Sequence, residues 1–340
     1  MTSANKTAGC PLCLRPTSLN ETDAWGLKES DPRFRLVRCA ACGIGWTAPA
    51  LPDSEIGRWY PAAYYGKENV RFNALFESMV RLFRQRRAGA IKRWAGVPDA
   101  LLRQAPSERS NNGRMVLDVG CGRGFILKFL RDAGFEPFGV ELSESAAWHA
   151  RHRLGLDIHV GDFDSAPYKK GQFHAVVFWH SLEHFRRPFD AVSRAHSLLK
   201  PGGVLIVAVP NSDSLQAALF GPAWFHLDIP RHYTHFGLHS LGKTLRRAGF
   251  DIVQTDHFSF EQNPYGWLQS IYNAFGMEFN FLYSILKTHS SRTIPLRKHP
   301  FQAALILATL PLFLPLALLL TLIEAGLRRG GTIEVYAVKK

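Results

Sequence analysis

Four cysteines near the N-terminus stand in two pairs, with two residues inside each pair. The pairs are Cys10 with Cys13 and Cys39 with Cys42, and 25 residues separate them. Two thiolates on one tight turn can occupy two corners of a tetrahedron, and a second pair completes it. The spacing predicts a structural Zn²⁺ ion in a zinc ribbon, with no open position for catalysis. Free thiols or a redox pair are the alternative interpretation.

A glycine-rich turn follows an apolar strand pattern at residues 115–119 and leads into a helical pattern. Its glycines, Gly120, Gly122 and Gly124, let the backbone bend sharply and approach a ligand closely. The spacing is not the Gly-x-Gly-x-x-Gly of dinucleotide-binding folds. Asp118 precedes the glycines, and its carboxylate suits a ligand with an ammonium group and would repel a diphosphate.

Further polar side chains stand where other predicted strands end. Glu141 closes a strand 21 residues after Gly120, and an acid there can accept hydrogen bonds from both ribose hydroxyls. Asp162 closes the next apolar segment, and Trp179 with His180 follow the strand after that. From Met115 to Phe260, short apolar runs alternate with helical periods, which is typical of a parallel α/β sheet.

This succession resembles the class I S-adenosylmethionine (SAM)-dependent methyltransferases over about residues 113–260 and the last strand around 332–338. Together with the ribbon, it is similar to the ubiquinone-biosynthesis O-methyltransferase-like group. The resemblance implies a doubly wound Rossmann-like sheet and SAM as cofactor. It also implies which residues contact each part of SAM. Asp118, Gly120, Gly122 and Gly124 would frame the methionine part, and Glu141 would hold the ribose. Asp162 and Phe163 would contact the adenine, and Trp179 and His180 would lie near the sulfonium.

Histidines supply the candidate general bases for a hydroxyl or acidic-carbon acceptor. His180 and His184 follow the fourth strand, at the edge of the sheet where ligands bind in doubly wound folds. His232 belongs to a histidine-rich segment, residues 224–236, after the fifth strand, and we expect this segment to cover the pocket. Helix capping, metal ligation by His180 and His184, and simple packing of His232 are the alternatives.

The chain divides into five parts on this interpretation. A zinc ribbon occupies 1–48, and an aromatic and basic amphipathic helical linker occupies 49–112. The methyltransferase core covers 113–260, an apolar insertion follows at 261–330, and the final strand of the core sheet lies at 331–340.

The apolar insertion raises the question of a membrane. Residues 301–323 carry no charge and would extend about 34 Å as a helix, enough to cross a bilayer core. Both flanks are basic, and the last strand must return to the sheet, so we expect a re-entrant hairpin or an in-plane insertion bent at Pro311 and Pro315. A buried helix, a dimer contact and a true span are the alternatives. The basic stretch 71–94 predicts a helix on anionic lipid or, alternatively, one packed on the core.

Overall charge and hydropathy narrow the function classes. The 340 residues include 41 Lys and Arg against 28 Asp and Glu, a net charge of +13, which favours an anionic partner. The mean hydropathy of −0.09 excludes a polytopic membrane protein. Residues 1–25 show no export signal, so we expect a cytoplasmic protein, peripheral or re-entrant on the inner membrane face.

The leading hypothesis is a SAM-dependent methyltransferase acting by O- or C-methylation on an apolar or lipid-linked acceptor at the cytoplasmic membrane face. A small-molecule acceptor and an anionic membrane surface are the expected partners. The alternative is an RNA methyltransferase that binds nucleic acid through the ribbon and the basic surface.

Overall fold

A computed structural model describes residues 9–13, 34–51, 55, 74–96, 113–287, 294 and 296–340. Much of the predicted ribbon between its two cysteine pairs, and most of the predicted linker over 49–112, lie outside the described residues. The methyltransferase-like core, the cysteines and nearly all of the apolar insertion lie within them.

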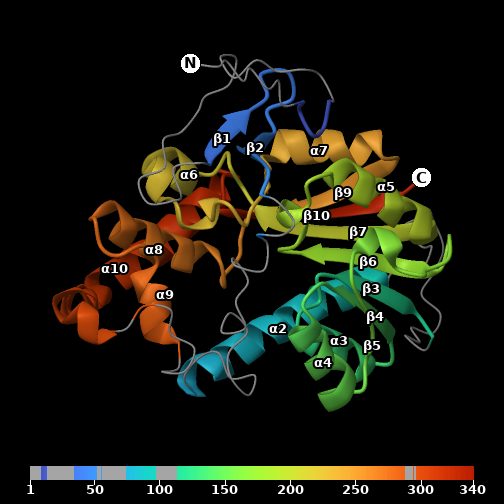
Figure 1. Ribbon diagram of the computed structural model, residues 1–340, viewed down its shortest axis with the longest axis horizontal. Helices are drawn as coiled ribbons and strands as arrows, with labels where there is room; N and C mark the ends of the chain where they lie inside the picture. The colour runs from blue at the N-terminus through green and yellow to red at the C-terminus, as the bar shows by residue number, and fades with distance from the viewer. Residues whose placement is uncertain are drawn as a thin grey trace.

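A seven-stranded sheet forms the centre of the molecule, in the order β5-β4-β3-β6-β7-β10-β9 (Figure 1). The first five strands in this order are parallel, and β10 runs antiparallel to both of its neighbours. This arrangement confirms the predicted doubly wound sheet, with the end of the chain inserted as a strand. The strands are β3 (Met115–Val119), β4 (Glu136–Glu141), β5 (Asp157–Val160), β6 (Phe173–Trp179), β7 (Leu199–Pro210), β9 (Phe250–Asp256) and β10 (Thr332–Lys339).

Helices cover both faces of the sheet, so both faces are buried. Successive side chains of a strand point to opposite faces and therefore enter two different cores. In β6, Val176 and Phe178 belong to one apolar core, while Ala175 and Val177 belong to the other. The first core is covered by α5 (Pro188–Leu198), α7 (Leu238–Arg247) and the cysteine region; the second is covered by α2 (Ala74–Ala95), α3 (Phe125–Arg131) and α4 (Glu144–Trp148) with the π-helical turn His149–Arg153.

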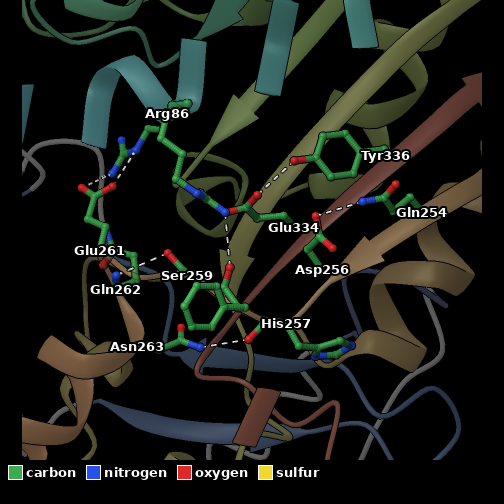
Figure 2. Close-up of polar contacts among 12 residues, drawn as sticks. Arg86, Gln254, Asp256, His257, Ser259, Glu261, Gln262, Asn263, Glu334 and Tyr336 are labelled. Atoms are coloured by element: carbon green, nitrogen blue, oxygen red, sulfur yellow. Dashed lines mark hydrogen bonds and ion pairs between the residues drawn. The ribbon is translucent and has the colours of Figure 1, made fainter. Parts of the chain in front are cut away.

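Helix α2 confirms the predicted basic helix, but its surroundings differ from those expected of a lipid-binding helix. Phe83, Ala88 and Ile91 are buried. The Arg86 guanidinium pairs with the Glu334 carboxylate of β10 at 2.9 Å, and the Tyr336 hydroxyl donates to the same carboxylate at 3.0 Å (Figure 2). The alternative, a helix packed on the core, therefore describes residues 83–95.

The cysteine region contains β1 (Arg35–Arg38) and β2 (Gly45–Ala48), which pair with each other and, through β2, with β8 (Thr234–His235). The four cysteine sulfurs gather in one cluster, with Sγ–Sγ distances of 3.2–3.5 Å for Cys13 to the other three and 3.5 Å between Cys10 and Cys42. These separations are far longer than a disulfide bond of about 2.05 Å. They are close to the ~3.8 Å edge of a tetrahedron of sulfurs around Zn²⁺ with bonds of about 2.3 Å. The residues therefore fit a tetrathiolate zinc site.

The apolar insertion folds as α8 (Asn263–Ala274), α9 (Phe281–Leu286), a short 3₁₀ turn (Leu296–Lys298) and α10 (Pro300–Gly326), which we call the helical lobe. It lies beside the sheet in Figure 1. Helix α10 is continuous through Pro311 and Pro315, so the expectation of a hairpin bent at these prolines is wrong. The helix is long and apolar enough to cross a membrane by composition, with a mean hydropathy of 2.5 over its most apolar stretch.

One stripe of α10 nevertheless packs on protein along its length. Ile306, Ala317, Thr321 and Glu324 are buried, at helical spacing. The Tyr272 hydroxyl of α8 donates to the carbonyl of Ile306 at 3.3 Å. These contacts show that α10 packs on protein along one stripe, while most of its apolar surface stays exposed.

The Glu324 carboxyl anchors the end of α10 to the sheet. Its oxygens accept hydrogen bonds from the Gln216 amide at 3.0 and 3.2 Å and from the backbone N–H of Gly331 at 3.3 Å. The side chain is fully buried, and burial raises its pKa to about 8. The folded chain therefore holds this proton over a pH range in which the unfolded chain has released it.

Stability should fall as the pH rises from about 4.5 to about 8, because over this window the folded state binds more protons than the unfolded state. The variant Glu324→Gln stays neutral and should lose this slope. It should be more stable than the wild type at about pH 9 and nearly equal to it at about pH 5, with about 1.4 kcal/mol for each unit of pKa shift. Denaturant unfolding measures this, with the exposed Glu278→Gln as control. Parallel profiles for Glu324→Gln and wild type would contradict the assignment.

Candidate active site

The glycine-rich turn lies at the carboxyl end of β3. The backbone N–H groups of Gly120 and Cys121 both donate to the carbonyl of Val140, at 2.8 and 3.1 Å. Gly120, Gly122 and Gly124 have φ values of +82°, +55° and +75°, which other residues rarely adopt. The turn is thereby fixed against the end of β4.

Gly120 also approaches the segment after β6. A Cβ atom added to Gly120 would lie 2.7 Å from the Cβ of Ser181. Only glycine permits this separation, so the turn and the residues that follow Trp179 are in direct contact. The sequence-predicted cofactor turn and the predicted bases are brought to one edge of the sheet, as expected for parallel strands.

Two predicted carboxylates flank the turn. Asp118 is buried, and burial raises its pKa to about 7 although the Arg87 guanidinium acts in the opposite direction. Glu141 accepts hydrogen bonds from the backbone N–H groups of Gly122 and Ser143, both at 2.8 Å. The Glu141 carboxylate is thus held at the mouth of the turn by the turn itself.

The predicted adenine contacts lie after β5 and differ from each other. Asp162 is exposed at the start of a 3₁₀ turn, Phe163–Ser165. The Phe163 ring is buried and packs edge-on against Phe178 and Phe185, at centroid distances of 5.7 and 6.4 Å. The Phe163 ring therefore packs in the core beneath this edge of the sheet, and its predicted place beside adenine stays a prediction.

Trp179 is buried at the end of β6, where the Arg87 guanidinium lies 5.6 Å from its ring centroid. Arg87 is held by the Glu261 carboxylate through Nε at 2.8 Å, and Figure 2 shows Glu261 beside the Arg86 network. Sequence reasoning missed Arg87 and Glu261 because 174 residues separate them and neither belongs to a motif.

The predicted bases surround a buried carboxylate. The short turn Leu182–His184 places Glu183 only 2% exposed, with its Oε1 3.4 Å from the Nδ1 of His180. Burial favours the neutral form of Glu183, but the hydrogen bond from His180 and the nearby His184 and His232 outweigh it and lower its pKa to about 2. His180 has φ +53°, a strained conformation for a non-glycine residue at this edge.

Residues 224–236, which we call the histidine loop, close over this carboxylate. The Nδ1 of His232 lies 2.9 Å from the His226 carbonyl, and the Nδ1 of His184 lies 2.9 Å from the Arg231 carbonyl. A carbonyl only accepts, so each Nδ1 carries the proton and each Nε2 is the basic nitrogen. The two rings meet at a centroid distance of 4.9 Å.

Burial lowers the pKa of His232 to about 4, so its imidazole is neutral near pH 7. The Asp228 carboxylate lies 3.8 Å from His232 Nε2, and a Glu183 carboxylate oxygen lies within 4.8 Å of a ring nitrogen of His232. Two carboxylates beside a neutral imidazole stabilise the imidazolium that forms when it accepts a proton. One donor atom each of Glu183, His184 and His232 lies within 4.8 Å of the others, so the same side chains have the types and spacing to hold a metal ion.

The histidine loop is braced by the helical lobe. The Phe225 backbone N–H donates to the Ser270 hydroxyl of α8 at 2.9 Å, and the Asn273 amide donates to the Ala223 carbonyl at 3.1 Å. The Phe225 ring packs on Tyr265 at 5.0 Å. The lobe and the predicted bases are therefore parts of one packed assembly.

Comparison with known proteins agrees with this geometry. Residues 83–255, half of the chain, match a family described as a methyltransferase domain. The chain is 28% identical over 144 residues to a probable S-adenosylmethionine-dependent methyltransferase of Mycolicibacterium smegmatis, covering 42% of this chain and 54% of the relative. It is 32% identical over 155 residues to a ubiquinone biosynthesis O-methyltransferase of Bordetella avium, covering 42% and 64%. These matches span about half to two thirds of the relatives' length.

A solved structure of Haemonchus contortus phosphoethanolamine N-methyltransferase 2 in complex with S-adenosyl-L-methionine shares the fold. The TM-score is 0.50 at 16% identity, covering 87% of this chain and 63% of that one. The sheet order, the glycine turn at its carboxyl edge and the match over half of the chain lead to one conclusion: the chain belongs to the family of SAM-dependent methyltransferase domains.

Proposed function

We propose that this protein transfers the methyl group of SAM to an apolar or lipid-linked acceptor, by O- or C-methylation, at the cytoplasmic face of a membrane. The observation that carries the proposal is the packing of the histidine loop between the glycine turn's edge of the sheet and an apolar helical lobe. This packing places the glycine turn, which would bind SAM, close to a candidate base and to an apolar surface suited to contact lipid.

The residues of the glycine turn fit SAM. Asp118 would hold the ammonium of the methionine part, and Glu141 would accept the ribose hydroxyls in place of a backbone N–H. The exposure of Gly120 supports this fit, because a ligand can reach the backbone of the turn at the carboxyl end of β3. When bound, SAM supplies an electrophilic methyl group on a sulfonium.

His232 is the residue best suited to take a proton from the acceptor. Its Nε2 carries the lone pair, and the Glu183 and Asp228 carboxylates stabilise the charge that it gains. The His184 ring packs edge-to-face against the His232 ring, and its Nδ1 orders the loop through the Arg231 carbonyl. His180 orients Glu183 through its Nδ1.

The helical lobe would dock on an anionic membrane with α10 in the plane of the interface. One face of α10 packs on protein and the other is apolar and exposed, which suits the headgroup and acyl boundary. Arg297 and Lys298 are exposed at the start of the helix, where they suit anionic headgroups. The exposed large side chains of α10 are Phe301, Leu305, Leu307, Leu312, Leu314, Leu316, Leu319, Leu322 and Ile323.

The cysteine cluster would hold structural zinc. Four sulfurs that all lie within 4.8 Å of one another would fill a tetrahedral site with no open position, so the site suits folding rather than catalysis. A thiol hydrogen bond from Cys42 lowers the pKa of Cys10 to about 5, which already favours a thiolate in the cluster.

The wild type should bind SAM in calorimetry, and Asp118→Asn should weaken binding by about tenfold or more because the ammonium loses its carboxylate. Since the pKa of Asp118 is about 7 in the free protein, wild-type affinity should also fall as the pH drops below that value. Asp251→Asn, on the exposed edge strand β9, is the control. Equal affinities for wild type and Asp118→Asn would count against this site.

One zinc ion per chain should be found by elemental analysis of purified protein, and Cys39→Ser should lose most of it together with thermal stability. Cys121→Ser changes a cysteine outside the cluster and should keep the metal. Zinc-free wild-type protein of unchanged stability would refute the tetrathiolate.

The protein should float with vesicles of phosphatidylcholine and phosphatidylglycerol. Leu312 and Leu319 are 68% and 54% exposed, so the double variant Leu312→Glu/Leu319→Glu should lose most flotation because buried carboxylates oppose insertion. Val253→Glu, at a 45% exposed position on β9, is the matched control. Equal flotation of the double variant and wild type would contradict docking through α10. If the protein did not bind lipid but bound bulk RNA in a salt-sensitive way, the RNA alternative would be favoured.

A further inference from the structure

The cysteine region forms one wall of the histidine loop. Strand β2 begins three residues after Cys42 and pairs with β8, with Gly45 opposite His235 and Trp46 opposite Thr234. The Thr47 backbone N–H continues this contact by donating to the Tyr233 carbonyl at 2.9 Å. The cysteine turn is thus connected to the loop by a short strand rather than by a flexible linker.

The Thr47 hydroxyl makes the innermost contact. It lies 2.6 Å from the His232 carbonyl and 3.2 Å from the Nε2 of His235, and Thr47 is 3% exposed. A hydroxyl has one proton, and the carbonyl only accepts, so the Thr47 O–H donates to His232 and accepts from the Nε2–H of His235. One side chain therefore fixes the backbone of His232 and the tautomer of His235.

The cysteine region also has its own anchors on the core. The Arg247 guanidinium of α7 donates to the Leu12 carbonyl beside Cys13, and Arg38 pairs with Asp213 after β7 at 2.9 Å. The region is therefore anchored on the core as well as on the loop, so a change in its position can be transmitted to the loop.

The glycine turn is fixed by different partners. Gly120, Cys121 and Gly122 contact the Val140 carbonyl, the Glu141 carboxylate and Ser181, and among the described residues none of these contacts comes from β2. A change in the cysteine region should therefore reach the histidine loop and leave the cofactor cradle intact.

We infer that the cysteine region is a positioning element of the methyl-transfer site, and that Thr47 is the positioning residue through which this region holds His232. The role of His232 in proton transfer comes from the proposed function, and the inference rests on it. The mechanical link from the cysteine cluster through β2 to the loop does not, and it is tested separately.

The experiment compares Thr47→Val, Thr47→Ser and Thr332→Val in the full chain. Valine keeps the shape and the backbone N–H of Thr47 but removes the hydroxyl, whereas serine keeps the hydroxyl. Thr332 is also buried, and its hydroxyl has no hydrogen-bond partner among the described residues, so Thr332→Val is the matched control.

In Thr47→Val, amide hydrogen exchange over 226–236 should rise by about tenfold, while exchange over 115–130 should stay unchanged. The ring Nε2–H signal of His235 in ¹⁵N-histidine spectra should broaden or shift. Thr47→Ser should restore both, and Thr332→Val should alter neither. Unchanged exchange and an unchanged ring signal in Thr47→Val would overturn the inference, and so would equal changes in the serine variant.

Removal of the metal provides the second arm. Wild-type protein stripped by a mercurial and a chelator should show the same local rise in exchange over 226–236, with SAM affinity within about twofold of the untreated protein. If SAM affinity fell together with the rise in exchange over 226–236, the inference that the glycine turn is independent of the cysteine region would be overturned. Failure of untreated wild type to bind SAM would refute the proposed function instead, and the exchange data would still decide the link.

Discussion

The close approach of Gly120 to Ser181 is the constraint on which the candidate active site depends. It leaves no room for a side chain between the turn after β3 and the segment after β6. Because these strands are parallel neighbours, the carboxylates that precede and follow the turn come to the same edge as Glu183 and its histidines. The contact between Gly120 and Ser181 therefore sets how the glycine turn lies relative to Glu183 and its histidines.

The electrostatics of this edge follow from the different charged partners of two buried carboxylates. Asp118 is buried with little compensation and holds its proton near neutral pH, whereas Glu183 is equally buried but stays ionised among three imidazoles. The two carboxylates differ in protonation for this reason: Asp118 is protonated below about pH 7, whereas Glu183 stays ionised beside its histidines. Their identical burial shows that partners, rather than depth, decide the protonation state.

Local patterns in the sequence were sufficient for the sheet, the glycine turn and the cysteine cluster, since each depends on residues close together in the chain. The strand ends at Val119, Glu141 and Trp179 match the structure for this reason. The pairs Arg86–Glu334, Arg87–Glu261 and Thr47–His232 could not be predicted, because each joins segments more than 170 residues apart and carries no motif. The wrong hairpin at Pro311 and Pro315 has a similar cause: α10 packs on protein along one stripe and stays a continuous helix despite a local helix-breaking signal.

Strand β10 lies between β7 and β9, although the chain reaches it only after α10. The edge strand β9 pairs with the sheet only through β10. It can therefore join the sheet only after residues 257–331 have folded so that β10 returns beside β7. The lobe is accordingly a loop closed at both ends rather than an appendage. Whatever the lobe contacts outside the protein, its two ends are fixed by β9 and β10, which pair with each other in the same sheet.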